Sequence, residues 1–320
     1  MNTSQPLKDK EIDISVIIPV YGCDESLQKL HERLTVSLES IVKNHEIIFI
    51  DDGGPEKTWE IIQNIANRDD SVKGIRLSRN FGQHLAITAG LEESIGRWVV
   101  VMDCDLQDKP EEIVKLYEKA QSGVDIVFAQ RVDRQDSFFK KSASKLFYKV
   151  LGYLTDTRLD YSVANFGIYD RKVINAVLEM KEAHKFFPIM VRWVGFSSAS
   201  IKVSHADRIY GETTYSLRSL VALSFGVILS FSDKPLRLIV KSGFIVSFIS
   251  TIYALFIVVN ALSSDIAVVG WSSIMASMWL ISGILMSIVG VVGLYVGKTF
   301  DETKSRPLYI IDKQTNYSNK

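Results

Sequence analysis

The sequence has little that would mark a secreted, disulfide-bonded or nucleic-acid-binding protein. It holds only two cysteines in 320 residues, Cys23 and Cys104. Two thiols that far apart along the chain predict neither a disulfide framework nor a cysteine-based metal site, and a reducing compartment is the default expectation. The first thirteen residues lack the apolar core of a signal peptide. Basic and acidic residues number 37 each, so the net charge is zero and no nucleic acid is expected as a partner.

Several common nucleotide-binding motifs are also missing. The chain has no GxGxxG and no GxxxxGK[ST], which argues against a dinucleotide-binding Rossmann protein and a P-loop NTPase. No set of His and Cys residues has the spacing of a zinc site. Any nucleotide would therefore have to be held by other means.

Acidic residues are scarce in the last third, where only five of the 37 follow Tyr215. Residues 242–264 and 266–297 carry no formal charge. A membrane-spanning helix needs roughly 20 apolar residues, so we expect two transmembrane helices, near 239–262 and 271–296. The alternative is a buried helical hairpin of a soluble protein, whose core helices rarely run uncharged this long.

Basic residues flank both expected spans, whereas the connecting loop holds only Asp265. The positive-inside rule then places both termini in the cytosol. We expect a flexible N-terminus (1–12), a cytosolic catalytic domain (13–215), an interfacial amphipathic region (216–235), two transmembrane helices (236–297) and a cytosolic tail (298–320). The flanking cations are Lys234, Arg237, Lys241, Lys298, Lys304 and Arg306.

Before residue 131 the pattern alternates between strands and helices. Short β-branched runs predict buried strands, and apolar residues at helical spacing predict the helices between them. This alternation is typical of an α/β fold with a mostly parallel sheet and helices on both faces. The expected strands are 14–20, 46–51, 72–78, 98–103 and 125–130, and the expected helices are 25–43, 57–68, 83–94 and 110–122.

Carboxylates follow two of these strands. Asp51 and Asp52 end one, and Asp103-Cys104-Asp105 ends another. Ligands of parallel sheets bind beyond the carboxyl ends of the strands, and hard carboxylate oxygens suit Mg²⁺ or Mn²⁺ bridging a diphosphate. A solvated turn at Asp103–Asp105 and a helix cap at Asp51-Asp52 remain open as alternatives.

Seven motifs occur in one order along the chain: SVIIPVY (15–21), FIDDGG (49–54), LSRNFGQHLAITAGL (77–91), VVVMDCDLQDKPEEI (99–113), GETTY (211–215), FSDKPLRL (231–238) and SRPLYII (305–311). Together they resemble the polyisoprenyl-phosphate glycosyltransferases of glycosyltransferase family 2, which include dolichol-phosphate mannose synthase and bactoprenol glucosyltransferase. The resemblance implies a GT-A fold, a nucleotide-sugar donor, a divalent metal and a lipid-phosphate acceptor. It spans about residues 13–311, and the two-span C-terminus resembles the bacterial branch.

The resemblance also implies roles for single residues. Asp105 and Asp103 match the metal-binding DxD, and Asp105 is the better ligand. Asp105, Asp108, Asn165 and Arg208 are the candidate catalytic residues. The candidate nucleotide-sugar-binding residues are Pro19, Tyr21, Asp51, Asp52, Arg79, Asp103 and Gln107.

Two positions depart from the family pattern. Asn165 stands where bacterial relatives commonly have the Asp of GDFR, and Thr214 replaces the Lys of GESKY. We expect these changes to affect the sugar and the details of the site more than the reaction. A processive polysaccharide synthase is rejected, because Ile189 replaces the Gln of QxxRW and only two spans are expected.

The expected acceptor explains why no general base is needed. A lipid monophosphate is mostly dianionic at neutral pH because its second pKa is about 6, so it attacks directly and inverts the anomeric centre. His84 is therefore expected to be structural. Arg131, Arg134, Lys140 and Arg208 are the candidate acceptor-phosphate ligands. Lys140 belongs to the basic, aromatic segment 138–153, which suits an anionic membrane surface but also fits an ordinary amphipathic helix.

The sequence thus predicts a transferase of the bacterial inner membrane that uses a nucleotide sugar, UDP-linked in preference to GDP-linked, and undecaprenyl phosphate. Its other expected partners are the lipid bilayer and a second copy of itself. The competing hypothesis is a donor-binding scaffold in a glycan assembly complex, with catalysis weakened by Asn165 and Thr214. The complete DxD favours the enzyme.

Overall fold

The computed structural model describes residues 11–131, 163–182, 185–204, 234, 236–245, 248–249, 252 and 270–316. The chain divides into two compact units. One comprises residues 1–150, 157–216 and 306–320, and the other comprises 151–156 and 217–305. The last fifteen residues therefore return to the unit that contains the N-terminal domain.

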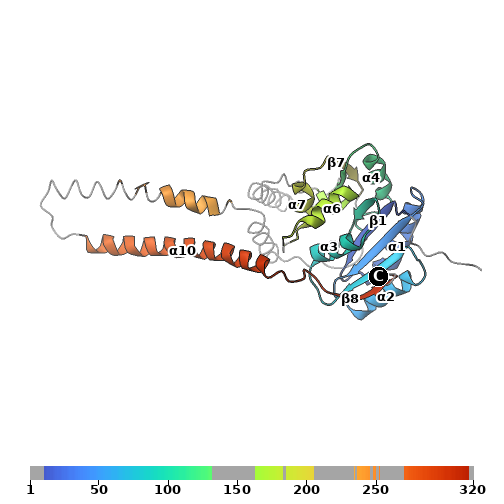
Figure 1. The fold of residues 1–320 in the computed structure, drawn as a ribbon, viewed down its shortest axis with the longest axis horizontal. Coiled ribbons are helices and arrows are strands. Elements are labelled where there is room, and N and C mark those ends of the chain that lie inside the picture. The colour runs from blue at the N-terminus through green and yellow to red at the C-terminus, as the bar shows by residue number, and fades with distance from the viewer. Residues whose placement is uncertain are drawn as a thin grey trace, which may run out of the picture. The chain divides into compact units, whose positions relative to one another are not determined.

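The first unit is built on one eight-stranded sheet (Figure 1). The strand order is β7-β5-β6-β4-β1-β2-β3-β8. Pairs β1–β2, β1–β4, β2–β3 and β5–β7 are parallel, whereas β3–β8, β4–β6 and β5–β6 are antiparallel. The strands are β1 (Ile14–Val20), β2 (His45–Asp51), β3 (Val72–Leu77), β4 (Trp98–Val101), β5 (Ile126–Arg131), β6 (Val163–Asp170), β7 (Ser198–Val203) and β8 (Ile311–Thr315).

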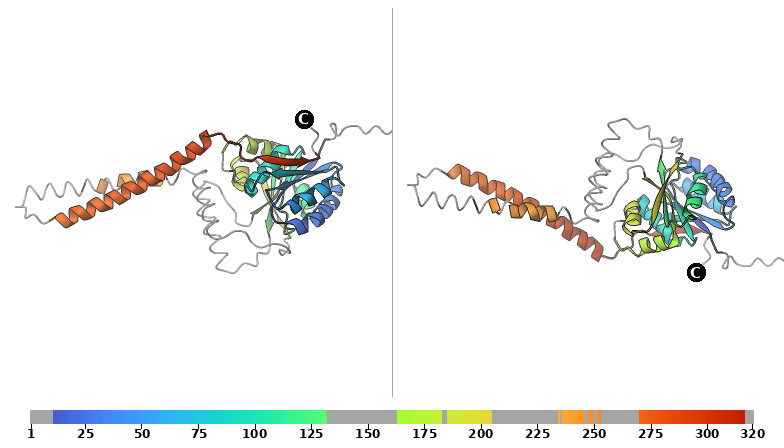
Figure 2. Two further views of the ribbon diagram at one scale, coloured as in Figure 1. Left: turned by 90° about the horizontal axis from the view of Figure 1, so that it is seen from below. Right: turned by 90° about the horizontal axis from the view of Figure 1, so that it is seen from above.

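Helices cover both faces of this sheet (Figure 2). Successive side chains of β1 point to opposite faces. Ile14, Val16 and Ile18 point into the main core, which also contains apolar residues of α1, α2 and α4. Ile17 points the other way and packs so closely on α3 that a Cβ at Gly90 would lie 2.5 Å from its Cγ2. Among the described residues of the first unit, the helices are α1 (Asp24–Glu39), α2 (Glu56–Ala66), α3 (Gln83–Glu93), α4 (Glu112–Ala120), α6 (Arg171–Glu179) and α7 (Phe187–Trp193).

The α/β class and the five N-terminal strands are confirmed, but the sheet is mixed. Strand β5 does not lie beside β4, because the antiparallel β6 is inserted between them. Strands β6, β7 and β8 had not been predicted. Strand β7 is not a buried strand of the predicted kind, because its burial changes at every residue and leaves three side chains exposed.

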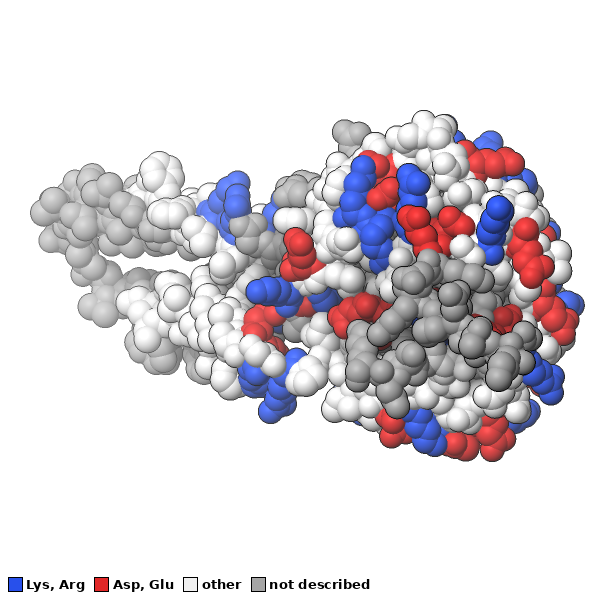
Figure 3. Space-filling model, turned by 45° about the vertical axis from the view of Figure 1, so that its right-hand side comes forward, with Lys and Arg blue, Asp and Glu red and all other residues white. Residues whose placement is uncertain are grey.

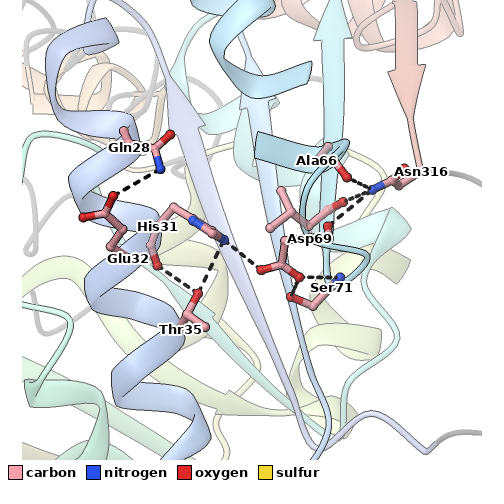
Figure 4. Close-up of polar contacts among 9 residues, drawn as sticks. Gln28, His31, Glu32, Thr35, Ala66, Asp69, Ser71 and Asn316 are labelled. Carbon is pink, nitrogen blue, oxygen red and sulfur yellow. Dashed lines mark hydrogen bonds and ion pairs between the residues drawn. The ribbon is translucent and has the colours of Figure 1, made fainter. Parts of the chain in front are cut away.

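The C-terminal strand β8 is an antiparallel edge strand paired with β3. Asn316 follows it and donates from Nδ2 to the carbonyls of Ala66 (2.5 Å) and Val72 (2.9 Å), at the turn between α2 and β3 (Figure 4). Asp69 of the same turn accepts from Ser71 and contacts His31 of α1 at 2.8 Å. The segment expected to be only a cytosolic tail therefore completes the sheet.

Within the described residues of the second unit, α10 (Trp271–Thr303) is the one helix long and apolar enough to cross a membrane, over Ile281–Thr303. It begins where the second span was expected but continues past Gly297 through Lys298. The first expected span, 239–262, lies largely outside the described residues, as does the region 216–235. Length and composition alone are the basis for describing α10 in this way.

Candidate functional site

The sheet brings the predicted nucleotide residues to one edge. Strands β4, β1, β2 and β3 are parallel neighbours, so their carboxyl ends share an edge. Tyr21 follows β1, Asp51 ends β2, Arg79 follows β3 and Asp103 follows β4. Tyr21 is 53% exposed and Arg79 is exposed, with its guanidinium 4.0 Å from the centre of the Phe81 ring. Pro19 is buried within β1 and pairs with Ile50.

Asp52 joins the loop after β2 to the loop after β3. Its Oδ1 accepts from the backbone N–H of Phe81 (2.7 Å), and its Oδ2 accepts from that of Gly82 (2.9 Å). Burial raises the pKa of this carboxyl, and the two backbone N–H groups partly offset the rise. Both oxygens thus hold the start of α3, so this geometry shows a structural contact for Asp52.

Gly53 permits this close approach of the two loops. Its φ is +67°, and a Cβ there would lie 2.3 Å from the backbone carbonyl carbon of Arg79. Backbone atoms cannot rotate away as a side chain would. Glycine is therefore required here both by conformation and by space.

We expect Gly53→Ala to destabilise the first unit by about 2–4 kcal/mol, in the range of severe single substitutions. Gly22→Ala is the matched control, because Gly22 also has a positive φ, +71°, but nothing lies within 4 Å of its Cβ position. It should cost only about 1–2 kcal/mol of backbone strain. Thermal melts of the two full-length variants test this, and equal melting temperatures would contradict the clash.

Asp51 lies deeper than its neighbour. The side chain is fully buried, Oδ1 accepts from the N–H of Gly54 at 2.8 Å, and Oδ2 lies 3.4 Å from Nε of Arg76. Burial raises the pKa of this carboxyl, which Gly54 and Arg76 partly offset. Arg76 also pairs with Glu56, which Lys313 of β8 contacts at 3.3 Å. Contact between Asp51 and a nucleotide stays a prediction.

The DxD segment forms a tight loop after β4. Asp103 is partly exposed and accepts at Oδ1 from Nε2 of Gln83, 2.7 Å away. Asp105 is 9% exposed and accepts at Oδ1 from the backbone N–H of Gln107, 3.1 Å away. Leu106, which lies between Asp105 and Gln107, is buried with φ +62°, an uncommon conformation for a bulky residue. Such strain persists where surrounding contacts enforce it, often at functional sites.

The carboxylates of this loop fit a divalent cation. Asp103 and Asp105 offer hard oxygen donors, and Asp108 of the same segment is almost fully buried. Among the described residues no group of three or more His, Cys, Asp or Glu side chains is arranged for a metal. Two carboxylates suit Mg²⁺ or Mn²⁺ that is completed by substrate phosphates rather than by an all-protein cage.

The two cysteines correct an expectation. Cys23 and Cys104 are joined by a disulfide with Cα atoms 6.1 Å apart, although 81 residues separate them in sequence. Parallel pairing of β1 and β4 places the loops after these strands side by side, which chain distance could not indicate. Ser26 reinforces the junction, because its Oγ donates to the carbonyl of Cys104 at 2.7 Å. The bond ties the loop after β1 to the DxD loop.

Two more candidates reach this edge through the antiparallel strand. Val101 of β4 pairs with Gly167 of β6, so Asn165, two residues before Gly167, lies toward the same edge of the sheet as Asp103. Asn165 is partly exposed, and its carbonyl accepts from the hydroxyl of Tyr169 at 3.3 Å. Strand β5 runs antiparallel to β6, so Arg131 ends β5 at the same edge. Arg134, Lys140, Arg208 and Thr214 lie outside the described residues.

His84 is expected to be structural, and its surroundings are those of a weakly basic imidazole. It lies in the first turn of α3 with its ring 4.5 Å from that of Phe186. Burial lowers the pKa of His84 to about 4, so the ring is neutral at neutral pH. Sequence reasoning missed Gln83, its neighbour, although Gln83 lies within the quoted motif of residues 77–91.

Charge on the visible face of the first unit is mixed. Figure 3 shows Lys and Arg interspersed with Asp and Glu there, in agreement with the zero net charge.

Comparisons with known proteins agree with this geometry. The profile of "Glycosyl transferase family 2" matches residues 15–178. An uncharacterized glycosyltransferase, YkcC, of Bacillus subtilis is 36% identical over 97% of both chains. An undecaprenyl-phosphate 4-deoxy-4-formamido-L-arabinose transferase of Aeromonas hydrophila is 34% identical over 93% of this chain and 92% of its own.

A solved structure is also similar in fold. It is glucosyl-3-phosphoglycerate synthase of Mycobacterium tuberculosis in complex with Mn²⁺, UDP and phosphoglyceric acid. It covers 68% of this chain and 77% of its own, with 16% identity and a TM-score of 0.49.

Proposed function

The chain belongs to glycosyl transferase family 2, and from this membership we propose that it is a membrane-anchored, inverting transferase that moves a hexose from a UDP-sugar to undecaprenyl phosphate. The product would be a polyprenyl-phosphate sugar for modifying a cell-surface glycan. The observation that carries the proposal is the 34% identity to an undecaprenyl-phosphate sugar transferase, which extends over 93% of the chain and therefore beyond the sheet. Its name describes an enzyme, so the scaffold alternative is not favoured.

The site edge supports direct attack by the acceptor. A phosphate dianion needs no general base, and the lowered pKa of His84, about 4, makes that histidine a weak one. Asn165, toward the same edge of the sheet as Asp103, could donate its amide N–H groups to a sugar hydroxyl or phosphate oxygen without adding negative charge. Arg131 ends β5 at the same edge and is our candidate for orienting the acceptor phosphate. Orientation of this kind supplies much of the rate.

Mg²⁺ or Mn²⁺ is the proposed cofactor, with Asp105 as its main protein ligand and Asp103 as the second. Such an ion supplies charge stabilisation for a leaving diphosphate. The chain's contribution is to hold the two carboxylates in place: Gln107 donates to Asp105, and Gln83 donates to Asp103. Asp51, Tyr21 and Arg79 remain the proposed contacts for the nucleotide.

Chain connectivity supports two membrane crossings. Strand β8 follows α10 after only a short connection, yet it belongs to the same sheet as β1 to β7. If α10 crosses the membrane, the chain must cross an odd number of further times between β7 and α10. One additional span, as expected at 239–262, is the simplest solution. Lys298, Lys304 and Arg306 near the end of α10 favour a cytosolic position for the sheet.

This topology predicts that a fluorescent protein fused after Lys320 will fluoresce in the cytosol of a Gram-negative host, whereas alkaline phosphatase fused there will be inactive. The same two reporters placed in the loop after Asp265 should give the opposite result. Active phosphatase at the C-terminus would overturn the assignment.

The reaction is tested with the full-length protein in detergent. UDP-glucose, other UDP-hexoses and GDP-mannose are supplied singly with undecaprenyl phosphate and MgCl₂ or MnCl₂, and the release of nucleoside diphosphate and the formation of glycolipid are measured. We expect one UDP-sugar to react only when lipid and metal are both present. If the GDP-sugar reacts and no UDP-sugar does, the assignment of a UDP-linked donor is wrong. If no donor reacts, the proposed reaction is wrong.

A further inference from the structure

The short segment between β3 and α3, residues 79–83, contacts both acidic motifs. In the middle of this segment, the backbone N–H groups of Phe81 and Gly82 donate to Asp52. The adjacent residue, Gln83, donates from Nε2 to Oδ1 of Asp103 at 2.7 Å. The segment therefore connects the turn after β2 to the DxD loop after β4, across the intervening β1.

Hydrogen bonding to a carboxylate is strong and directional. A bond to a charged acceptor is about twice as strong as one between neutral groups. The amide of Gln83 can present only N–H groups to a carboxylate oxygen, so this contact selects one orientation of the Asp103 side chain. The backbone of the same loop is held separately, by the hydroxyl of Ser26, which donates to the carbonyl of Cys104.

We propose that Gln83 is a positioning residue that sets the Asp103 carboxylate for the metal-bound diphosphate of the donor. The inference rests on the proposed function, because it assumes that Asp103 faces a metal–nucleotide complex. Partners that orient metal-ligating carboxylates typically change metal affinity by about 10–100-fold when they are removed.

A purely structural role for Gln83 explains less. The residue is partly exposed in the first turn of α3, and the packing of that helix depends on the buried Ala86, Ile87, Ala89 and Leu91. The start of α3 is already fixed by Asp52 through backbone groups that a side-chain substitution leaves in place. Loss of the Gln83 amide should therefore affect Asp103 far more than the fold.

Gln83→Met tests this, because methionine keeps the length and the helix propensity but cannot donate. Gln28→Met is the matched control: Gln28 also donates to a carboxylate, that of Glu32 at 3.2 Å, on the exposed face of α1 (Figure 4). Calorimetric titration of UDP into each full-length protein, with and without MnCl₂, gives two dissociation constants per variant. Thermal melts verify that each variant is folded.

We expect Gln83→Met to weaken UDP binding in MnCl₂ by about tenfold, and to leave binding without metal and the melting temperature close to wild type. Gln28→Met should change neither constant. An equal loss with and without metal, a loss of folding, or no loss would overturn the positioning role. The wild-type titration judges the proposed function separately: absence of any Mn²⁺ effect there would overturn the metal assignment and this inference with it.

Discussion

Asp105→Ala should abolish turnover. The carboxylate is nearly buried in a loop that the bond from the backbone N–H of Gln107 and the left-handed Leu106 help to shape, and it is the proposed main ligand of the metal. Losing a ligand that supports charge stabilisation of a diphosphate costs several kcal/mol, which corresponds to about a thousandfold in rate. We expect kcat to fall by at least this factor at saturating donor.

The measurement is glycolipid formation over a range of MnCl₂ concentrations. Asp70→Ala is the control, since Asp70 is an exposed aspartate in the turn before β3, and it should keep wild-type kinetics. Activity of Asp105→Ala within tenfold of wild type, at an unchanged requirement for metal, would show that Asp105 is not the ligand.

The strand–helix alternation up to residue 131 could be predicted from sequence because each buried parallel strand is a short β-branched run. The same property predicted that Asp51 and Asp103 would share an edge. Strand order could not be predicted, because the antiparallel β6 enters between β4 and β5 from a segment more than 30 residues further along the chain. Periodicity describes neighbours in sequence, and it carries no information on such an insertion.

Within the site, sequence motifs identified residues but not their contacts. Asp52 was predicted to be one of the nucleotide-sugar-binding residues, yet both of its oxygens accept from backbone N–H groups of the loop after β3. Cys23 and Cys104 were considered too distant to pair, yet parallel strands bring them together. Gln83 carried no signal of its own, because a single amide has no characteristic spacing. Such contacts arise from strand order, which sequence did not provide.

Strand β8 was the least predictable element. It anchors the C-terminal residues to the sheet, next to the segment that leads into the candidate site. Its residues IDKQT have no alternating apolar pattern. The carbonyl of Ile310 accepts from the N–H of Ser78 at 2.9 Å, directly before Arg79. The methyl group of Thr315 approaches Gly74, where a Cβ would lie 2.7 Å from it. Glycine at position 74 therefore leaves room for the returning chain.

A chain that ends at Ser305 should consequently lose stability and activity together. Truncation exposes the whole edge of β3, removes Lys313 from Glu56, and leaves the carbonyls of Ala66 and Val72 without Asn316. At a net value of about 1 kcal/mol for each hydrogen bond, we expect a loss of about 4–6 kcal/mol. For a domain of this size each 1 kcal/mol lowers the melting temperature by roughly 2–4 °C, so a fall of about 8–24 °C should be seen.

A chain that ends at Asn316 is the matched control, because it keeps every described contact of β8 and should melt and turn over as the full-length protein does. Tyr309→Phe separates one contact from the strand as a whole, since it removes only the hydroxyl that donates to Glu92 of α3. Its effect should stay within about 1.5–3 kcal/mol, the value of a single hydrogen bond to a charged group. If the chain ending at Ser305 melts within 3 °C of the Asn316 form, β8 does not stabilise the sheet. The connectivity argument for two membrane crossings would then lose its basis as well.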